Sequence, residues 1–114
     1  MNIELTRFRV LPGKTASVNE WMELLNSSLP VVLETLEQEK MYVETIFSES
    51  IDGVEYLYWY SIQGENGVEV KDSNHEIDKA HLRYWKECID PDYAPQDLRP
   101  RVNMIPERIQ SLMK

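Results

Sequence analysis

The order of apolar and polar residues predicts a strand and then a long helical region at the start of the chain. Residues 2–10 alternate between two faces, which is typical of a strand. One face carries Glu4, Thr6, Phe8 and Val10, and the other carries Ile3, Leu5, Arg7 and Arg9. After a turn at residues 11–13, apolar residues recur with helical spacing and fall on one stripe. The stripe consists of Val18, Met22, Leu25, Leu29, Val32 and Leu36.

Two local signals set the bounds of this helical region. Ser17 and Glu20 form a capping-box sequence, which predicts that the helix begins near Ser17. Pro30 lacks an N–H and collides with the carbonyl four residues before it. We therefore expect either a kink just before Pro30 or two nearly collinear helices, with Ser27 or Ser28 capping the second.

Residues 41–51 and 54–63 are predicted to form a hairpin. The dipeptide Asp52-Gly53 between them is typical of a two-residue type I′ turn. On one face this turn would pair Ile51 with Val54, Phe47 with Tyr58, Thr45 with Tyr60 and Val43 with Ile62. On the other it would pair Ser48 with Leu57, Ile46 with Trp59 and Glu44 with Ser61. Both faces carry large apolar groups, so we expect both to be covered.

The last part of the chain predicts a helix, a strand and a short terminal helix. Ser73 and Glu76 form a second capping box ahead of an apolar helical face, and Asp90-Pro91 ends that helix. The face carries Ile77, His81, Tyr84 and Cys88, with Leu82, Trp85 and Ile89 beside them. We expect the last strand at residues 101–105 and a helix from Pro106 to near Met113.

Read in order, these elements predict one α+β domain over residues 1–114 with ferredoxin-like β-α-β-β-α-β topology and a short C-terminal helix. Four antiparallel strands would carry two helices on one face. Because the helices cover only that face, the apolar residues of the other face predict a homodimer that pairs through the sheet.

Composition narrows the class of protein. A formal net charge of -8 argues against nucleic-acid or anionic-membrane partners, which are attracted by clustered Lys and Arg. The chain has one cysteine, Cys88, so it has no intrachain disulfide, and with two histidines it is a poor candidate for a zinc site. Neither a signal peptide nor a stretch of roughly 18 apolar residues is present. We expect a cytoplasmic protein without a metal or other cofactor.

Six strings of residues are spread over essentially the whole chain, at 4–8, 41–44, 55–60, 77–79, 81–90 and 104–106. Together they resemble a family of uncharacterised bacterial proteins, a domain of unknown function. The resemblance implies a dimeric α/β-barrel architecture. That superfamily includes cofactor-independent quinol monooxygenases, haem-degrading monooxygenases and stress-response dimers. It implies no catalytic residue, because the family has none assigned.

Five residues are candidates for a small-molecule pocket between helices and sheet: His81, Trp85, Trp59, Glu44 and Arg7. His81 falls on the buried face of its helix, where it could act as a general base or a haem ligand. The alternative is a core histidine bonded to backbone or to a carboxylate. Arg7 and Glu44 suggest a buried ion pair or an anion-binding spot, or else charges that project into water.

The remaining polar and aromatic residues leave three functions open. Tyr56, Tyr58 and Tyr60 share a strand face and could line a pocket, a core or a dimer interface. Cys88 is expected to be a small buried apolar residue. The first hypothesis is a small-molecule-binding dimer. The second is a cofactor-independent or haem-dependent monooxygenase, and the third is a structural or regulatory protein-interaction dimer.

Overall fold

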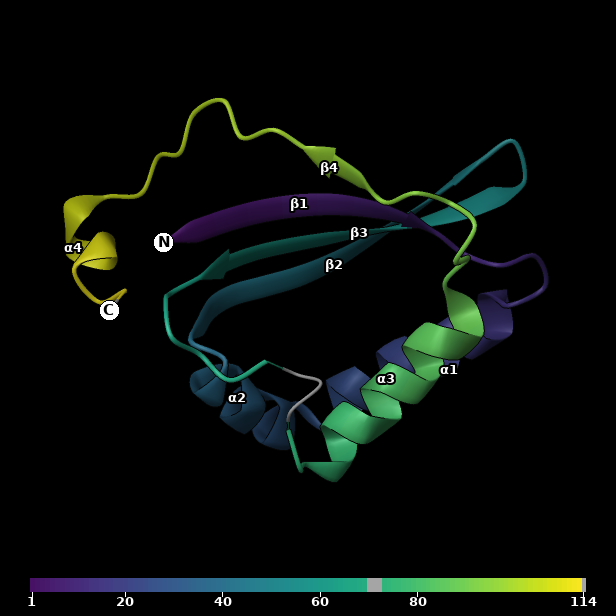
Figure 1. Cartoon of the computed structure of the whole chain (residues 1–114), viewed down its shortest axis with the longest axis horizontal. Coiled ribbons are helices and arrows are strands. Elements are labelled where there is room, and N and C mark those ends of the chain that lie inside the picture. Colours follow the sequence, from purple (N-terminus) through teal and green to yellow (C-terminus); the bar gives the residue numbers. More distant parts are fainter. Residues whose placement is uncertain (70–72, 114) are drawn as a thin grey trace.

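The computed structural model describes residues 1–69 and 73–113 and has the predicted ferredoxin-like α+β architecture. Its sheet consists of β1 (Asn2–Arg9), β2 (Met41–Ile51), β3 (Val54–Gln63) and β4 (Gln96–Leu98), in the order β2-β3-β1-β4. All its strand pairs are antiparallel. Three helices lie on one side of this sheet, and α4 (Glu107–Gln110) lies beyond its end (Figure 1). The three are α1 (Thr15–Ser27), α2 (Leu29–Gln38) and α3 (Glu76–Cys88).

The hairpin of β2 and β3 confirms the predicted turn and register. All seven predicted cross-strand pairs are present, from Ile51 with Val54 to Val43 with Ile62. Asp52 and Gly53 both have positive φ, 51° and 81°, as a type I′ turn requires. A register shift between Met41 and Val43 interrupts the ladder at its far end. Because side chains alternate along each strand, one face of the hairpin lies toward the helices and the other face lies away from them.

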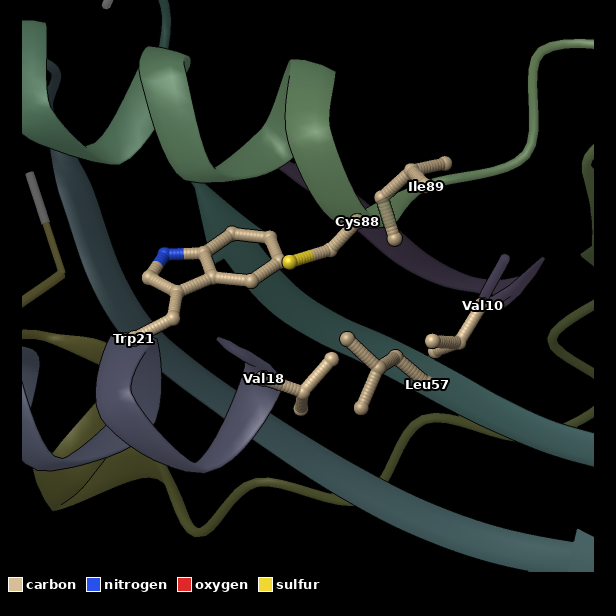
Figure 2. Packing of buried hydrophobic residues seen from close by; sticks show 6 residues of the cluster. All are labelled: Val10, Val18, Trp21, Leu57, Cys88 and Ile89. Atoms are coloured by element: carbon tan, nitrogen blue, oxygen red, sulfur yellow. The ribbon is translucent and has the colours of Figure 1, made fainter. Parts of the chain in front are cut away.

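The core lies where α1 and α3 pack on β3 (Figure 2). Trp21 of α1 is completely buried and belongs to one cluster with Val18, Leu57 and Cys88. Cys88 is buried and unpaired, as expected. The apolar stripe predicted for α1 missed Trp21, although three residues after Val18 is a position on the same helical face.

The helix ends differ from the capping predictions. Helix α1 begins at Thr15, before Ser17, and the Ser17 hydroxyl bonds Glu87 of α3 at 3.3 Å instead of capping. Pro30 does separate two helices, as one alternative expected, but neither Ser27 nor Ser28 caps α2 with its side chain. Leu29, directly at the break, is exposed, but the phase of the stripe survives Pro30, because Val32 and Leu36 are half-buried like Leu25 before the break.

The second predicted capping box is also not formed. Helix α3 begins at Glu76 after His75, which makes no side-chain capping bond. Ser73 lies two positions before the N-cap and accepts a hydrogen bond from the backbone N–H of His75 at 3.1 Å. The helix end is as predicted, since α3 stops at Cys88, just before Asp90-Pro91.

The position predicted for the last strand is wrong. Residues 101–105 form no strand, and β4 is the three-residue segment Gln96–Leu98. This segment pairs with β1, and the hydroxyl of Thr6 donates to Asp97 at 2.7 Å. Prolines at 100 and 106 flank the predicted segment and remove backbone donors at its ends. The terminal helix does follow Pro106, but it ends earlier than expected, at Gln110.

In the part of the chain that the structure describes, no helix is both long enough and apolar enough to cross a membrane.

Candidate functional site

A cavity of about 350 Å³ lies between the sheet and the helices. Three elements of the sheet, β1, β2 and β3, form one wall, and α1, α2 and α3 form the other. The lining side chains with polar groups are Glu4, Thr6, Thr35, Glu39, Glu44, Trp59, Ser61, Asp78, His81 and Trp85. The apolar ones are Phe8, Leu25, Val32, Leu36, Met41, Ile77 and Leu82.

Four of the five candidate site residues line this cavity. These are His81, Trp85, Trp59 and Glu44. Arg7 does not, because it occupies the opposite face of β1 from Phe8. Its Nε donates to the hydroxyl of Tyr93 at 2.9 Å, and its guanidinium lies 5.3 Å from the ring centre of Tyr56. The structure therefore contains no ion pair between Arg7 and Glu44, and Arg7 belongs to an aromatic cluster outside the pocket.

His81 is held by Trp21 rather than by a carboxylate or the backbone. The indole N–H of Trp21 donates to Nδ1 of His81 at 3.0 Å. Burial lowers the pKa of His81, while the charge of Asp78 opposes that change. A neutral His81 that accepts at Nδ1 carries its proton on Nε2. Among the described residues, Nε2 has no hydrogen-bond partner, so its N–H is free to serve a ligand.

Aromatic rings surround this imidazole. The ring centres of Trp59 and Trp85 are 5.2 Å apart, and both rings lie near His81, at 5.6 and 6.2 Å. Phe8 packs edge-on against Trp85 at 4.6 Å. These contacts fix the rings and leave a rigid apolar surface on one side of the cavity.

The wall of the cavity also carries acidic groups. Burial raises the pKa of Glu39 to about 7, and the charges of Glu44 and Asp78 add to the effect. Desolvation also raises the pKa of Glu44, against a hydrogen bond from Trp59 that lowers it. Glu44 lines the cavity but is exposed to solvent. No lysine or arginine is among the described lining residues.

Asp78 is the most unusual group of the site. The residue is only 6% exposed, and its Oδ2 is buried without any hydrogen-bond partner. Buried polar atoms nearly always have such a partner, because burial without one costs free energy. Asp78 lies in the first turn of α3, three residues before His81, so both side chains share the helix face that lines the cavity.

Sequence reasoning did not assign the carboxyl groups of Glu4, Glu39 and Asp78 to this pocket, and it missed Trp21 as the hydrogen-bond partner of His81. The spacing of Asp78 and His81 on one helix was a usable signal, because residues three apart are neighbours on a helix. Glu39 gave no signal of its own, since it follows α2 and meets the cavity only through the tertiary fold.

The side chains of the cavity can exchange protons with a bound molecule, but the described ones do not form a metal-binding cluster. An imidazole, and a carboxyl group whose pKa is about 7 as in Glu39, can exchange protons near neutral pH. Within residues 1–69 and 73–113, no three His, Cys, Asp or Glu side chains converge closely enough to hold a metal. The carboxylates are instead distributed around the wall.

Comparisons with known proteins confirm the family resemblance and the fold. The model of the "Family of unknown function (DUF6176)" matches residues 1–111. No curated protein matches the chain. A crystal structure of L-rhamnose mutarotase from Formosa agariphila is similar, with a TM-score of 0.55 and 18% identity, over 92% of this chain and 100% of the mutarotase chain. At that identity the likeness establishes the fold alone.

Proposed function

Because the chain belongs to the family of unknown function DUF6176, its role has to be inferred from the site, and we propose that it binds a small molecule in the pocket between helices and sheet. The observation that carries this proposal is Oδ2 of Asp78, a buried acceptor without a donor. A ligand that donates a hydrogen bond to this atom would remove the cost of its burial.

The size and lining of the cavity support this proposal. Its volume of about 350 Å³ lies at the lower end of the range for small-molecule sites. Rigid aromatic groups with a few converging polar groups are the usual composition of such sites. The binding that we propose requires no cofactor, since the chain's own side chains supply both the apolar surface and the polar contacts.

A thermal-shift screen with two matched variants tests the proposal. Val32→Phe would fill the cavity from α2, whereas Leu33→Phe adds the same ring to the next residue, which is exposed. We expect ligands to raise the melting temperature of the wild type and of Leu33→Phe but not of Val32→Phe. Ligands that stabilise all three proteins equally would contradict binding in this pocket.

A second candidate is an acid–base enzyme that interconverts sugar anomers. It is favoured by the free Nε2–H of His81 in the same cavity as Glu39, and by the similar fold of a protein described as a mutarotase. Ring opening needs one group to protonate the ring oxygen and another to take the proton of the anomeric hydroxyl. Exchange NMR on monosaccharides would measure this. Acceleration that is lost in His81→Ala supports the reaction, and unaccelerated exchange with every sugar contradicts it.

We also propose that the protein is a homodimer that pairs through the sheet face opposite the helices. Phe47 is more than half exposed there and borders a shallow depression with Leu5, Tyr58 and Tyr60. An apolar sheet face of this kind is usually covered in the functional protein.

The C-terminal arm, which we define as residues 99–113, supports the same dimer. It leads away from its own sheet (Figure 1) and exposes Val102, Met104 and Leu112 by 71, 84 and 80%. The arm carries three arginines and one glutamate in a chain of formal net charge -8. A second copy therefore offers both apolar surface and opposite charge to the arm.

The proposed setting of this dimer is the cytoplasm, without nucleic-acid or membrane partners. The single buried Cys88 suits a reducing compartment, and the acidic net charge disfavours anionic polymers and surfaces.

A further inference from the structure

We infer that the ligand of the sheet–helix pocket is an organic cation, a protonated amine with an apolar or aromatic body. The inference rests on the proposed function, because it names the class of molecule that the pocket takes. It is carried by the charge of the wall, by the unpartnered Asp78 and by the aromatic rings beside it.

The charges of the wall select against anions. Four carboxyl groups line the cavity, from β1, β2, the end of α2 and the first turn of α3: Glu4, Glu44, Glu39 and Asp78. No described lining residue is a lysine or an arginine, and burial keeps His81 neutral by lowering its pKa. A carboxylate or phosphate ligand would meet like charges without a counter-ion, whereas a cation would be attracted.

Asp78 supplies an observation that is independent of this charge count. Its side chain is buried to more than nine-tenths, it lines the cavity, and Oδ2 has no donor. An ammonium group brings up to three N–H donors and a positive charge. Charge-assisted hydrogen bonds of this kind are roughly twice as strong as neutral ones. A protonated amine is therefore a better partner for Oδ2 than a hydroxyl.

The aromatic rings explain why the cation should be organic. Trp59, Trp85 and Phe8 line the same cavity, and an indole face attracts a cation within about 6 Å of its centre. A bare metal ion would need several oxygen ligands around one point. The described residues contain no such group. The dispersed carboxylates and the rings between them instead fit a molecule that has a charged head and an apolar body.

The raised pKa of Glu39 also favours a cationic ligand. Glu39 has a pKa of about 7 because burial and the charges of Glu44 and Asp78 oppose its ionisation. A bound cation would favour the ionised form of the same carboxyl. Without a ligand, the carboxyl groups of the pocket repel one another, and a bound cation would reduce this repulsion.

Three probes of similar shape and different charge test the inference: benzylamine, benzyl alcohol and benzoate. Binding to the 114-residue protein is followed by NMR shifts of the indole N–H groups, near pH 7.5, where benzylamine is protonated. We expect benzylamine to bind about tenfold more tightly than benzyl alcohol, and benzoate to cause no saturable shift. Asp78→Asn should weaken benzylamine about tenfold and leave benzyl alcohol unchanged.

Glu76→Gln is the matched control for Asp78→Asn. It removes the same charge from the same first turn of α3, but its side chain is 85% exposed and does not line the cavity. It should bind benzylamine like the wild type. If Asp78→Asn does not fold, Glu44→Gln, on β2, gives the same comparison within the pocket.

The outcomes separate the cation inference from the proposed function. If Trp59 and Trp85 shift but benzylamine binds no more tightly than benzyl alcohol, or benzoate binds more tightly, the cation inference is wrong. The pocket would still be a binding site. Equal weakening by Glu76→Gln and Asp78→Asn would also overturn the cation inference, since the effect would then be long-range. If no probe shifts either indole, both the cation inference and the pocket proposal fail.

Discussion

Trp21 and His81 are joined by a hydrogen bond of 3.0 Å that links the largest fully buried side chain among the described residues to the wall of the pocket. Trp21 is completely buried between α1, α3 and β3, so its indole N–H has a fixed position. That N–H selects the form of His81 whose Nδ1 is unprotonated. The core thereby determines that Nε2 of His81, and not Nδ1, presents an N–H to a ligand.

Trp21→Phe tests this relationship. The change removes the donor to Nδ1, so protonation of His81 no longer meets an opposing N–H, and we expect the pKa of His81 to rise. Loss of the buried bond and of packing volume should also lower the free energy of unfolding by about 2 kcal/mol. NMR titration of the imidazole measures the first effect, and urea denaturation measures the second.

Trp85→Phe is the control for that experiment. It removes an indole N–H from the same pocket but leaves the bond between Trp21 and His81 in place. Its effect on the pKa of His81 should be clearly smaller. Equal pKa changes in the two variants would contradict the role of the hydrogen bond.

Glu39→Gln should change the pH dependence of stability. The folded pKa of about 7 lies above the ordinary value of 4.5, so ionisation of Glu39 destabilises the fold progressively from pH 4.5 to about pH 7. Glutamine removes this penalty. Because Glu39 is partly exposed, we expect a gain of only about 1 kcal/mol at pH 8 and almost none at pH 4.

Thermal unfolding of the two proteins at both pH values measures this difference. The melting temperature of Glu39→Gln should exceed that of the wild type by about 3–6 °C at pH 8. Glu37→Gln, an exposed neighbour at the end of α2, serves as the control and should show no such dependence. A gain of the same size at pH 4 and pH 8 would argue that the carboxyl of Glu39 is not destabilising when ionised.

Phe47→Glu should dissociate the proposed homodimer. The substitution places a charge on the exposed apolar surface of the sheet face opposite the helices. Light scattering coupled to size exclusion should report a dimer for the wild type and a monomer for this variant. Leu33→Glu makes the same change on α2, a surface on the helix side, and should remain dimeric.

Met104→Glu tests the part that the C-terminal arm plays in the same dimer. Met104 is the most exposed large apolar side chain of the chain's described residues, so its replacement should not disturb the fold of its own domain. We expect the dimer to weaken by at least about tenfold in dissociation constant. An unchanged dissociation constant would mean that the arm does not contact the second copy.

Short sequence signals correctly predicted the hairpin turn and the break between the first two helices, because both depend on the backbone preferences of one or two residues. Asp52-Gly53 specified the turn and with it the register of β2 and β3, because few other dipeptides adopt positive φ at both positions. Proline predicted the break between α1 and α2. The last strand was mislocated because three residues of β4 carry little pattern and are selected by pairing with β1.

The pocket was predictable only in part. His81, Trp85, Trp59 and Glu44 could be placed on faces that meet, since strand and helix periods determine those faces. Arg7 was assigned to the same pocket, although it alternates with Phe8 and therefore faces away. Its partner Tyr93 lies 86 positions later in the chain, and no local pattern could have indicated that contact.

Whether a small molecule occupies this pocket is tested most directly by an NMR titration of the three indole N–H groups with a set of amine and alcohol fragments. We expect saturable shifts of Trp59 and Trp85, which line the cavity, with a smaller response of Trp21, which contacts His81. Binding that leaves Trp59 and Trp85 unchanged and shifts residues of the outer sheet face instead would contradict this expectation.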